Sequence, residues 1–186
     1  MFFGFFIVAG IIVGYLAGGR LSNFQYVRIH LIWLIFTAVV LRLILKYLGF
    51  VQAGVLVGDI IILVFLIANL RENRAFLLAG IGFFANVIVI VLNKFAMPVG
   101  YRIQQLPIYA KTYQMLLNGE IPGYVLANES TKCYFLADIF YFPLYPKVGF
   151  FSIGDIILGI GGMLCIILFM KKEPIKATSI NTQTKV

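Results

Sequence analysis

The sequence predicts an all-α membrane protein: a bundle of five transmembrane helices with a folded region on the extracytoplasmic side. The first observation is composition, since 62% of the 186 residues are hydrophobic and 12% are charged. A soluble domain carries about 25% charged residues, so this chain has too little charge to cover a surface that faces water. The second observation is that the apolar residues form five runs, each close to the ~20 residues with which a helix crosses a bilayer.

The five runs follow one another along one domain, residues 1–172. Helices are the expected conformation because a backbone within lipid must satisfy its own hydrogen bonds. The first run lacks the basic leading segment of a signal peptide, so we interpret it as a retained span. Residues 173–186 are polar and predict a disordered cytoplasmic tail. The predicted spans are residues 2–18, 29–48, 51–70, 75–92 and 149–170.

The distribution of basic residues predicts the orientation. In a five-span bundle, three short basic segments fall on the same side, which the positive-inside rule makes cytoplasmic. The amino terminus is then outside and the carboxyl terminus inside a bacterial plasma membrane. This asymmetry accounts for the net charge of +8, so no nucleic-acid partner is predicted. The residues of these segments are Arg20, Arg28, Arg71, Arg74, Lys171 and Lys172.

Two further cations depart from this rule. Arg42 and Lys46 lie toward the outer end of the second run. Long basic side chains near a span end extend to the lipid headgroups, or they meet an acidic partner within the bundle. Both interpretations stay open from the sequence.

The connection 93–148 is too long for a plain loop and predicts a folded outer region. Between residues 106 and 117 the apolar side chains share one helical face, and Asn118-Gly119 supplies a stop signal. This pattern predicts an amphipathic helix that lies either in the membrane interface or against the bundle. The apolar face consists of Leu106, Tyr109, Ala110, Tyr113, Leu116 and Leu117.

Asp138 and Asp155 are the first candidates for chemistry. A carboxylate within lipid costs roughly 2.5–3.5 kcal/mol, so it needs a partner or a role. The apolar segment after Asp138 ends at Pro143 and can bring Asp138 back over Asp155. Two carboxyl groups that share a site cannot both ionise, so the pair would hold one acid and one base, as in aspartic proteolysis. Alternatively, Asp138 caps a turn and Asp155 forms hydrogen bonds within the bundle, for instance to Ser152.

Two other polar residues are candidate members of the same site. Asn93, at the outer end of the fourth run, is placed either to donate to a substrate carbonyl or an aspartate, or to cap its helix. Asp59 repeats the surroundings of Asp155, with Val-Gly-Asp-Ile-Ile against Ile-Gly-Asp-Ile-Ile, at a similar predicted depth. The single histidine, His30, lies toward the cytoplasmic end. The sequence therefore predicts no metal site and no cofactor.

Three segments, taken together, carry a resemblance to a known family. They are Asn-Lys-Phe-Ala-Met-Pro-Val from Asn93, Phe-Leu-Ala-Asp-Ile-Phe-Tyr-Phe-Pro around Asp138, and Phe-Ser-Ile-Gly-Asp-Ile-Ile around Asp155. The combination resembles a family of small five-span bacterial membrane proteins of unknown function. This resemblance covers nearly the whole chain and implies no activity.

The last third also resembles lipoprotein signal peptidase, more distantly. The resemblance implies that Asp138 and Asp155 form a catalytic dyad, with Asn93 as an orienting residue. That family has four spans, whereas five are predicted here.

Two local departures add to this difference. Asn128-Glu129 stands where the family has a segment that ends in Asp-Arg, and the arginine is missing. Ser152 replaces an asparagine.

Two classes of function follow from the sequence. The first is an aspartyl-type membrane peptidase with a lipid or membrane-peptide substrate, as the distant resemblance implies. The alternative is a non-catalytic protein that binds or transports a lipid or small solute, or a subunit of a membrane complex. The lipid bilayer is the predicted partner in either case, and the oligomeric state is not predicted.

Overall fold

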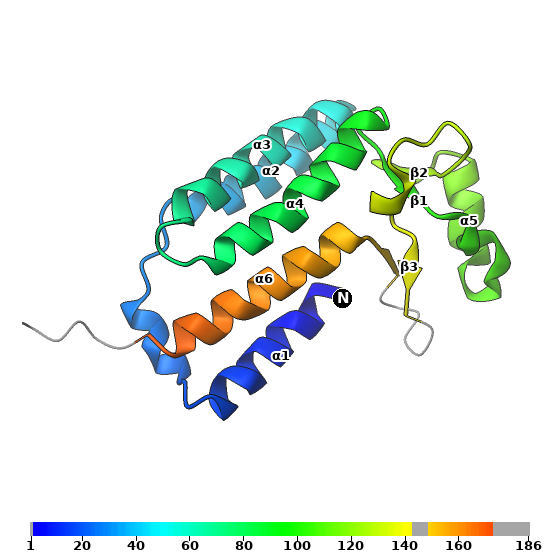
Figure 1. Ribbon diagram of the computed structural model, residues 1–186. Coiled ribbons are helices and arrows are strands. Elements are labelled where there is room, and N and C mark those ends of the chain that lie inside the picture. The colour runs from blue at the N-terminus through cyan, green and yellow to red at the C-terminus, as the bar shows by residue number, and fades with distance from the viewer. Residues whose placement is uncertain (1, 143–148, 173–186) are drawn as a thin grey trace, which may run out of the picture.

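A computed structural model describes residues 2–142 and 149–172 of the chain. Five long helices lie side by side, and a small unit of short strands and helices sits at one end of the bundle (Figure 1). The predicted tail and Pro143 lie outside the described residues. The long helices are α1 (Phe2–Leu16), α2 (Trp33–Tyr47), α3 (Val51–Asn69), α4 (Ala75–Leu92) and α6 (Ile153–Met170).

The second and last helices begin later than predicted, for two different reasons. The α2 helix begins at Trp33 rather than at residue 29. Asn69 binds the backbone of His30 there, accepting from its N–H at 2.8 Å and donating to its carbonyl at 2.9 Å. The α6 helix begins at Ile153 because the preceding Phe150–Phe151 pair forms a strand.

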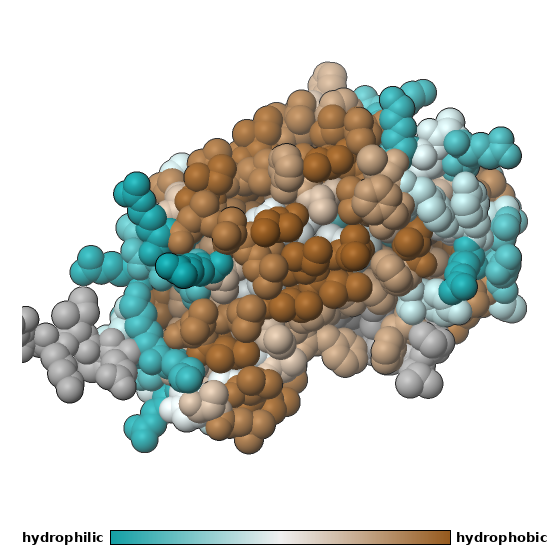
Figure 2. Space-filling model, in the orientation of Figure 1, coloured by the Kyte–Doolittle hydropathy of each residue, from teal (hydrophilic) through white to brown (hydrophobic). Residues whose placement is uncertain are grey.

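Three helices, α3, α4 and α6, are long and apolar enough to cross a membrane within the described part of the chain. Figure 2 shows an apolar surface over the bundle, with hydrophilic side chains gathered toward its two ends. Both features indicate association with a membrane. The α1 and α2 helices have 15 residues each. At ~1.5 Å per residue they are shorter than the ~30 Å hydrocarbon core, so for them the five-span prediction stays a prediction.

The helices pack in the spatial order α2, α3, α4, α6, α1. The closest approach joins α4 and α6, where a Cβ atom at Gly82 or Gly161 would collide with the backbone of the opposite helix. Small residues allow such close packing where no hydrophobic effect drives helices together in lipid. The main buried apolar cluster consists of Phe65, Leu66, Ala75, Phe76, Ala79, Cys165 and Phe169.

The connection between α4 and α6 folds into a small unit that contains strands, which the sequence analysis did not predict. We call its described residues, 93–142 and 149–151, the outer unit, after the side of the membrane on which the sequence predicts it. β1 (Met97–Val99) pairs in parallel with β2 (Tyr124–Leu126). β3 (Phe140–Tyr141) pairs antiparallel with β4 (Phe150–Phe151). The short 3₁₀ segments are η1 (Leu21–Tyr26), η2 (Tyr101–Gln105), η3 (Pro107–Tyr109) and η4 (Tyr134–Leu136).

The predicted amphipathic helix is present as η3 followed by α5 (Ala110–Leu117). It ends where expected, because Gly119 adopts a positive φ of 68°. Tyr109 and Leu116 pack with Val99 and Ile103 in a core that belongs to the outer unit itself. Part of the apolar face is thereby buried against β1 and η2, and its contact with a membrane interface stays a prediction.

Candidate functional site

The first turn of α6 fixes the position of Asp155. Ser152 is the N-cap, and its hydroxyl accepts a hydrogen bond from the Asp155 N–H at 2.9 Å. The Asp155 carboxylate in turn accepts from the Ser152 N–H at 3.1 Å. This reciprocal capping box satisfies two backbone donors that a helix start leaves unpaired. The hydrogen bond between Asp155 and Ser152, which the sequence analysis named under the alternative to a catalytic role, is therefore present.

Asn86, from the middle of α4, completes a closed triangle with these two side chains. Its amide donates to the Asp155 carboxylate at 2.7 Å, and its carbonyl oxygen accepts from the Ser152 hydroxyl at 2.8 Å. Gly154 makes the approach sterically feasible, because a Cβ atom there would overlap the Asn86 amide. The triangle locks the start of α6 to α4.

Asp138 is held by its backbone against the first strand of the outer unit. Its N–H donates to the Pro98 carbonyl at 3.0 Å, and its carbonyl accepts from the Gly100 N–H at 2.9 Å. The side chain is only 6% exposed. Its Oδ1 atom has no hydrogen-bond partner among residues 2–142 and 149–172. A buried polar atom without a partner costs free energy, so its presence calls for an explanation.

The two carboxyl groups occupy electrostatically different environments. Burial raises the pKa of Asp138 to about 8, and the negative charge of Asp155 adds to the rise. Asp138 is therefore a neutral acid at pH 7 and can donate a hydrogen bond. Asp155 accepts hydrogen bonds from the Asn86 amide and the Ser152 N–H, so both of its carboxylate oxygens have partners.

Asp138 lines a cavity of ≈ 340 Å³ within the outer unit. Most of the wall is apolar, and polar groups come from Asp138, Tyr109, Thr112 and Tyr124. Desolvation raises the pKa of the Tyr124 hydroxyl, and the charges of Asp138 and Asp155 raise it further. Asp155 is not part of the described wall of this cavity. An apolar cavity with a few polar groups is typical of a small-molecule site.

Asp59 does not share the surroundings of Asp138. It lies in α3, is 4% exposed, and forms an ion pair with Arg42 of α2. Arg42 therefore meets an acidic partner, which was one of the two interpretations left open by the sequence. Asp59 is thereby paired within the α2–α3 hairpin.

Asn93 caps α4 and holds a loop of the outer unit. Its amide donates to the carbonyls of Val89 and Lys132 at 2.7 and 2.9 Å, and its side-chain oxygen accepts from the Lys132 N–H at 3.0 Å. Within the described chain no hydrogen bond joins it to Asp138 or Asp155. The cap interpretation accounts for these contacts, and an orienting role stays a prediction.

The two remaining sequence candidates lie in an exposed turn. Asn128 binds the backbone and hydroxyl of Ser130, and its own N–H donates to Thr131. Glu129 is exposed beside it. Among residues 2–142 and 149–172, no group of three metal-ligating side chains could hold a metal ion.

Sequence reasoning missed Asn86 and Tyr124. Asn86 had a usable signal, since it is the one polar residue in the otherwise apolar stretch of α4, Ala75–Leu92. A polar side chain inside a span usually faces a partner within the bundle. Tyr124 had no such signal, because β2 is three residues long and its pairing with β1 depends on tertiary structure.

Comparison with known proteins gives one match. The model of a family of unknown function, DUF5317, matches residues 23–168. No curated protein and no solved structure matches the chain. The resemblance to lipoprotein signal peptidase therefore gains no support from these comparisons.

Proposed function

We propose a function for this chain on the premise that it belongs to DUF5317, a family of unknown function. All five long helices cross a bacterial plasma membrane, with the amino terminus outside and the carboxyl terminus in the cytoplasm. The cavity in the outer unit binds a small molecule, and Asp138 donates a hydrogen bond to it. Binding without turnover is the function favoured here.

Contacts at the opposite end of the bundle support this topology. His30 hydrogen-bonds Glu72 at 3.1 Å, and Lys172 lies 3.6 Å from the same carboxylate. Asn23 donates to the Met170 carbonyl at 2.7 Å. These contacts join the three basic segments at one end of the bundle, as the positive-inside rule requires for a cytoplasmic face.

Exposed apolar residues support contact of the outer unit with the membrane surface. Ile108 in η3 is 66% exposed, and Leu117 at the end of α5 is 51% exposed. When an amphipathic helix lies on a bilayer, its exposed apolar side chains become buried in the headgroup region. This arrangement would place the opening of the cavity close to the lipid headgroups.

One observation carries the binding proposal: Asp138 is a buried, neutral acid that lines a cavity and has an oxygen without a partner in the described chain. A carboxylic acid kept neutral at pH 7 by an apolar site is suited to donate a hydrogen bond. A ligand with a carbonyl, ester or phosphate oxygen would accept that bond. Pairing would remove the cost of an unsatisfied buried group, which is about 1–3 kcal/mol.

Hydrolysis is the second candidate, favoured by the influence of Asp155 on the pKa of Asp138. In such a reaction the Asp155 carboxylate would take a proton from water, and Asp138 would protonate the leaving group. Two features weigh against it. Both carboxylate oxygens of Asp155 already accept hydrogen bonds, and Asp155 is not part of the described cavity wall.

A carboxyl-labelling experiment tests the binding proposal. Dicyclohexylcarbodiimide is an apolar reagent that takes the proton of a carboxyl group and is then attacked at carbon by the carboxylate oxygen, so it reacts with protonated acids. We expect it to modify Asp138 at pH 7 in the detergent-solubilised protein, as located by peptide mass spectrometry, and to lose efficiency above pH 8. Inorganic phosphate, N-methylacetamide and methyl acetate then serve as small acceptor probes. We expect at least one of them to slow the labelling of Asp138.

The outcomes separate the two candidates. If no probe slows the labelling of Asp138, the binding proposal is wrong. Cleavage of an N-acetylated membrane peptide that disappears in both Asp138→Asn and Asp155→Asn would favour hydrolysis. Protection of Asp138 without any cleavage would favour binding alone.

A further inference from the structure

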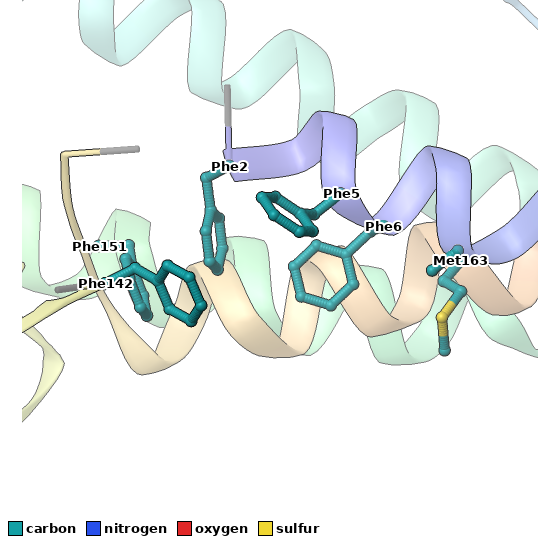
Figure 3. Close-up of a pocket in the computed structure, with 7 residues that line it drawn as sticks. Phe2, Phe5, Phe6, Phe142, Phe151 and Met163 are labelled. Carbon is teal, nitrogen blue, oxygen red and sulfur yellow. The ribbon is translucent and has the colours of Figure 1, made fainter. Parts of the chain in front are cut away.

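A second pocket lies beside the outer unit, between the beginnings of α1 and α6. Its volume is ≈ 290 Å³, and its wall is almost entirely apolar. Figure 3 shows the rings of Phe2, Phe5 and Phe6 projecting from α1 into the space beside Phe142 and Phe151. We call this the phenylalanine pocket, and its described wall consists of these five residues with Ala9 and Met163.

The two cavities share strand β4 as a wall. Successive side chains of a strand point to opposite faces. Phe150 accordingly lines the Asp138 cavity, where its ring lies 5.2 Å from that of Tyr109. Phe151 lines the phenylalanine pocket, where its ring stacks on Phe2 at 4.3 Å. The Asp138 cavity and the phenylalanine pocket thus lie on opposite faces of β4, lined by two successive residues.

The chemistry of the phenylalanine pocket restricts its occupant. The wall offers almost no hydrogen-bond partner, so a peptide segment there would leave its backbone groups unsatisfied. An apolar cavity of ~150 Å³ is known to accept benzene, so this pocket has room for a longer stretch of hydrocarbon. Part of its wall comes from α1 and α6, which carry exposed apolar side chains, and acyl chains are the abundant apolar material around such helices in a membrane.

We propose that the phenylalanine pocket takes one acyl chain of an amphiphile whose polar end reaches the Asp138 cavity. This inference rests on the function proposed above and names the class of its ligand: a lipid-like molecule with a hydrogen-bond acceptor close to the start of a hydrocarbon chain. Because the two cavities lie on opposite faces of β4, such a ligand must pass around this strand between its polar group and its chain.

The test compares two lysophosphatidylcholines that differ only in chain length, one butanoyl and one dodecanoyl. Protection of Asp138 from carbodiimide is measured for the full-length protein in lipid nanodiscs. We expect the dodecanoyl compound to protect at a concentration at least about tenfold lower, because each added methylene that leaves water favours binding. Ala9→Trp, which fills the pocket, should abolish this advantage. Ile7→Trp is the matched control, since Ile7 is exposed on the same helix and does not line the pocket.

A photo-crosslinking experiment tests the acyl-chain proposal independently if Ala9→Trp does not fold. A dodecanoyl chain with a terminal diazirine should label Phe5, Phe6 or Met163. A second apolar groove, lined by residues such as Leu63 and Ile81, serves as the internal comparison for ordinary lipid contact.

The failures are distinguishable. Labelling of the Leu63 groove alone, or an equal chain-length advantage in Ala9→Trp and Ile7→Trp, would overturn the acyl-chain proposal. Protection by the butanoyl compound would even then leave the binding function standing. If neither compound protects Asp138, the acyl-chain proposal is wrong, and the binding function is then decided by the small acceptor probes alone.

Discussion

Two Gly-Asp pairs with almost the same local sequence, Gly58-Asp59 and Gly154-Asp155, have different surroundings in this protein. Asp59 lies eight residues after the first residue of α3 and pairs with the Arg42 guanidinium of the neighbouring helix. Asp155 lies two residues after the first residue of α6 and closes a capping box. One acid is thus held by an opposite charge inside the bundle, and the other by the helix start.

Both glycines leave room for a side chain of the adjacent helix. A Cβ atom at Gly58 would overlap the side chain of Arg42, and one at Gly154 would overlap that of Asn86. Each glycine lets a side chain from the adjacent helix cross over to the aspartate that follows. The comparison teaches that a Gly-Asp pair in an apolar helix marks a crossing point between helices, while the partner decides how the charge is compensated.

Asp138 is buried like Asp59 but lacks both kinds of compensation, so it should give the largest effect. Its pKa is raised to about 8, so between pH 4 and pH 8 the native state keeps a proton that the unfolded state loses. The free energy of unfolding should therefore fall as pH rises across this window, by roughly 1.4 kcal/mol per pH unit. Chemical denaturation in detergent micelles at several pH values measures this slope.

Asp138→Asn should flatten this dependence, because an amide does not titrate. Glu129→Gln, at an exposed position in the same unit, is the control and should keep the wild-type slope. An unchanged slope in Asp138→Asn would show that Asp138 is not the group responsible.

Arg42→Ala should give the next largest effect, because it leaves the Asp59 carboxylate buried without its ion-pair partner. We expect the free energy of unfolding to fall by about 3 kcal/mol. Adding Asp59→Asn should recover a large part of that loss, since the buried charge is then gone. Lys46→Ala, an exposed cation one turn further along α2, should change the free energy of unfolding by less than about 0.5 kcal/mol.

Substitution of the two glycines compares the crossing points directly. Gly154→Ala should destabilise the protein by about 2 kcal/mol, because it forces Asn86 away from Asp155 and crowds the Gly82 carbonyl. Gly58→Ala should cost roughly half as much, since the atoms it meets belong to the flexible side chain of Arg42. Equal effects, measured as the loss in unfolding free energy, would contradict the different roles assigned to the two sites.

Ser152→Ala should have the smallest effect of the series, about 1 kcal/mol, through loss of the N-cap. The N-cap residue of α3, Phe50, makes no side-chain hydrogen bond to the helix, so α3 has no position equivalent to Ser152. Phe50→Ser should therefore leave stability unchanged or raise it slightly. A larger loss in Phe50→Ser than in Ser152→Ala would contradict this distinction.

Much of the fold could be predicted from the sequence, for reasons that are local. The apolar runs placed all five long helices, and α4 begins and ends where predicted, at Ala75 and Leu92. The Asn118-Gly119 stop and the bond between Ser152 and Asp155 depend on residues close together in the chain. Local steric and hydrogen-bonding preferences decide such features, so a sequence pattern suffices.

The rest could not be predicted because it depends on contacts between distant segments. The strands of the outer unit have two or three residues, too few for an alternating pattern. The later start of α6 could not be predicted either, because Phe150–Phe151 forms a strand with β3 and so leaves Asp155 in the first turn of its helix. The clamp of Asn69 on His30, 39 residues away, likewise shortened α2.

The sequence by itself therefore determined that this is a helical membrane protein, because its scarcity of charge and its apolar runs leave lipid as the compatible solvent. It also identified Asp138 and Asp155 as unusual acids. Only the tertiary structure decided which acid is compensated. Asn86 and Arg42 reach Asp155 and Asp59 across helix crossings, whereas β1 buries Asp138 beside a cavity without a described partner for one oxygen. Packing decides which polar group reaches which aspartate across 17 to 69 positions of chain, and no local pattern encodes it.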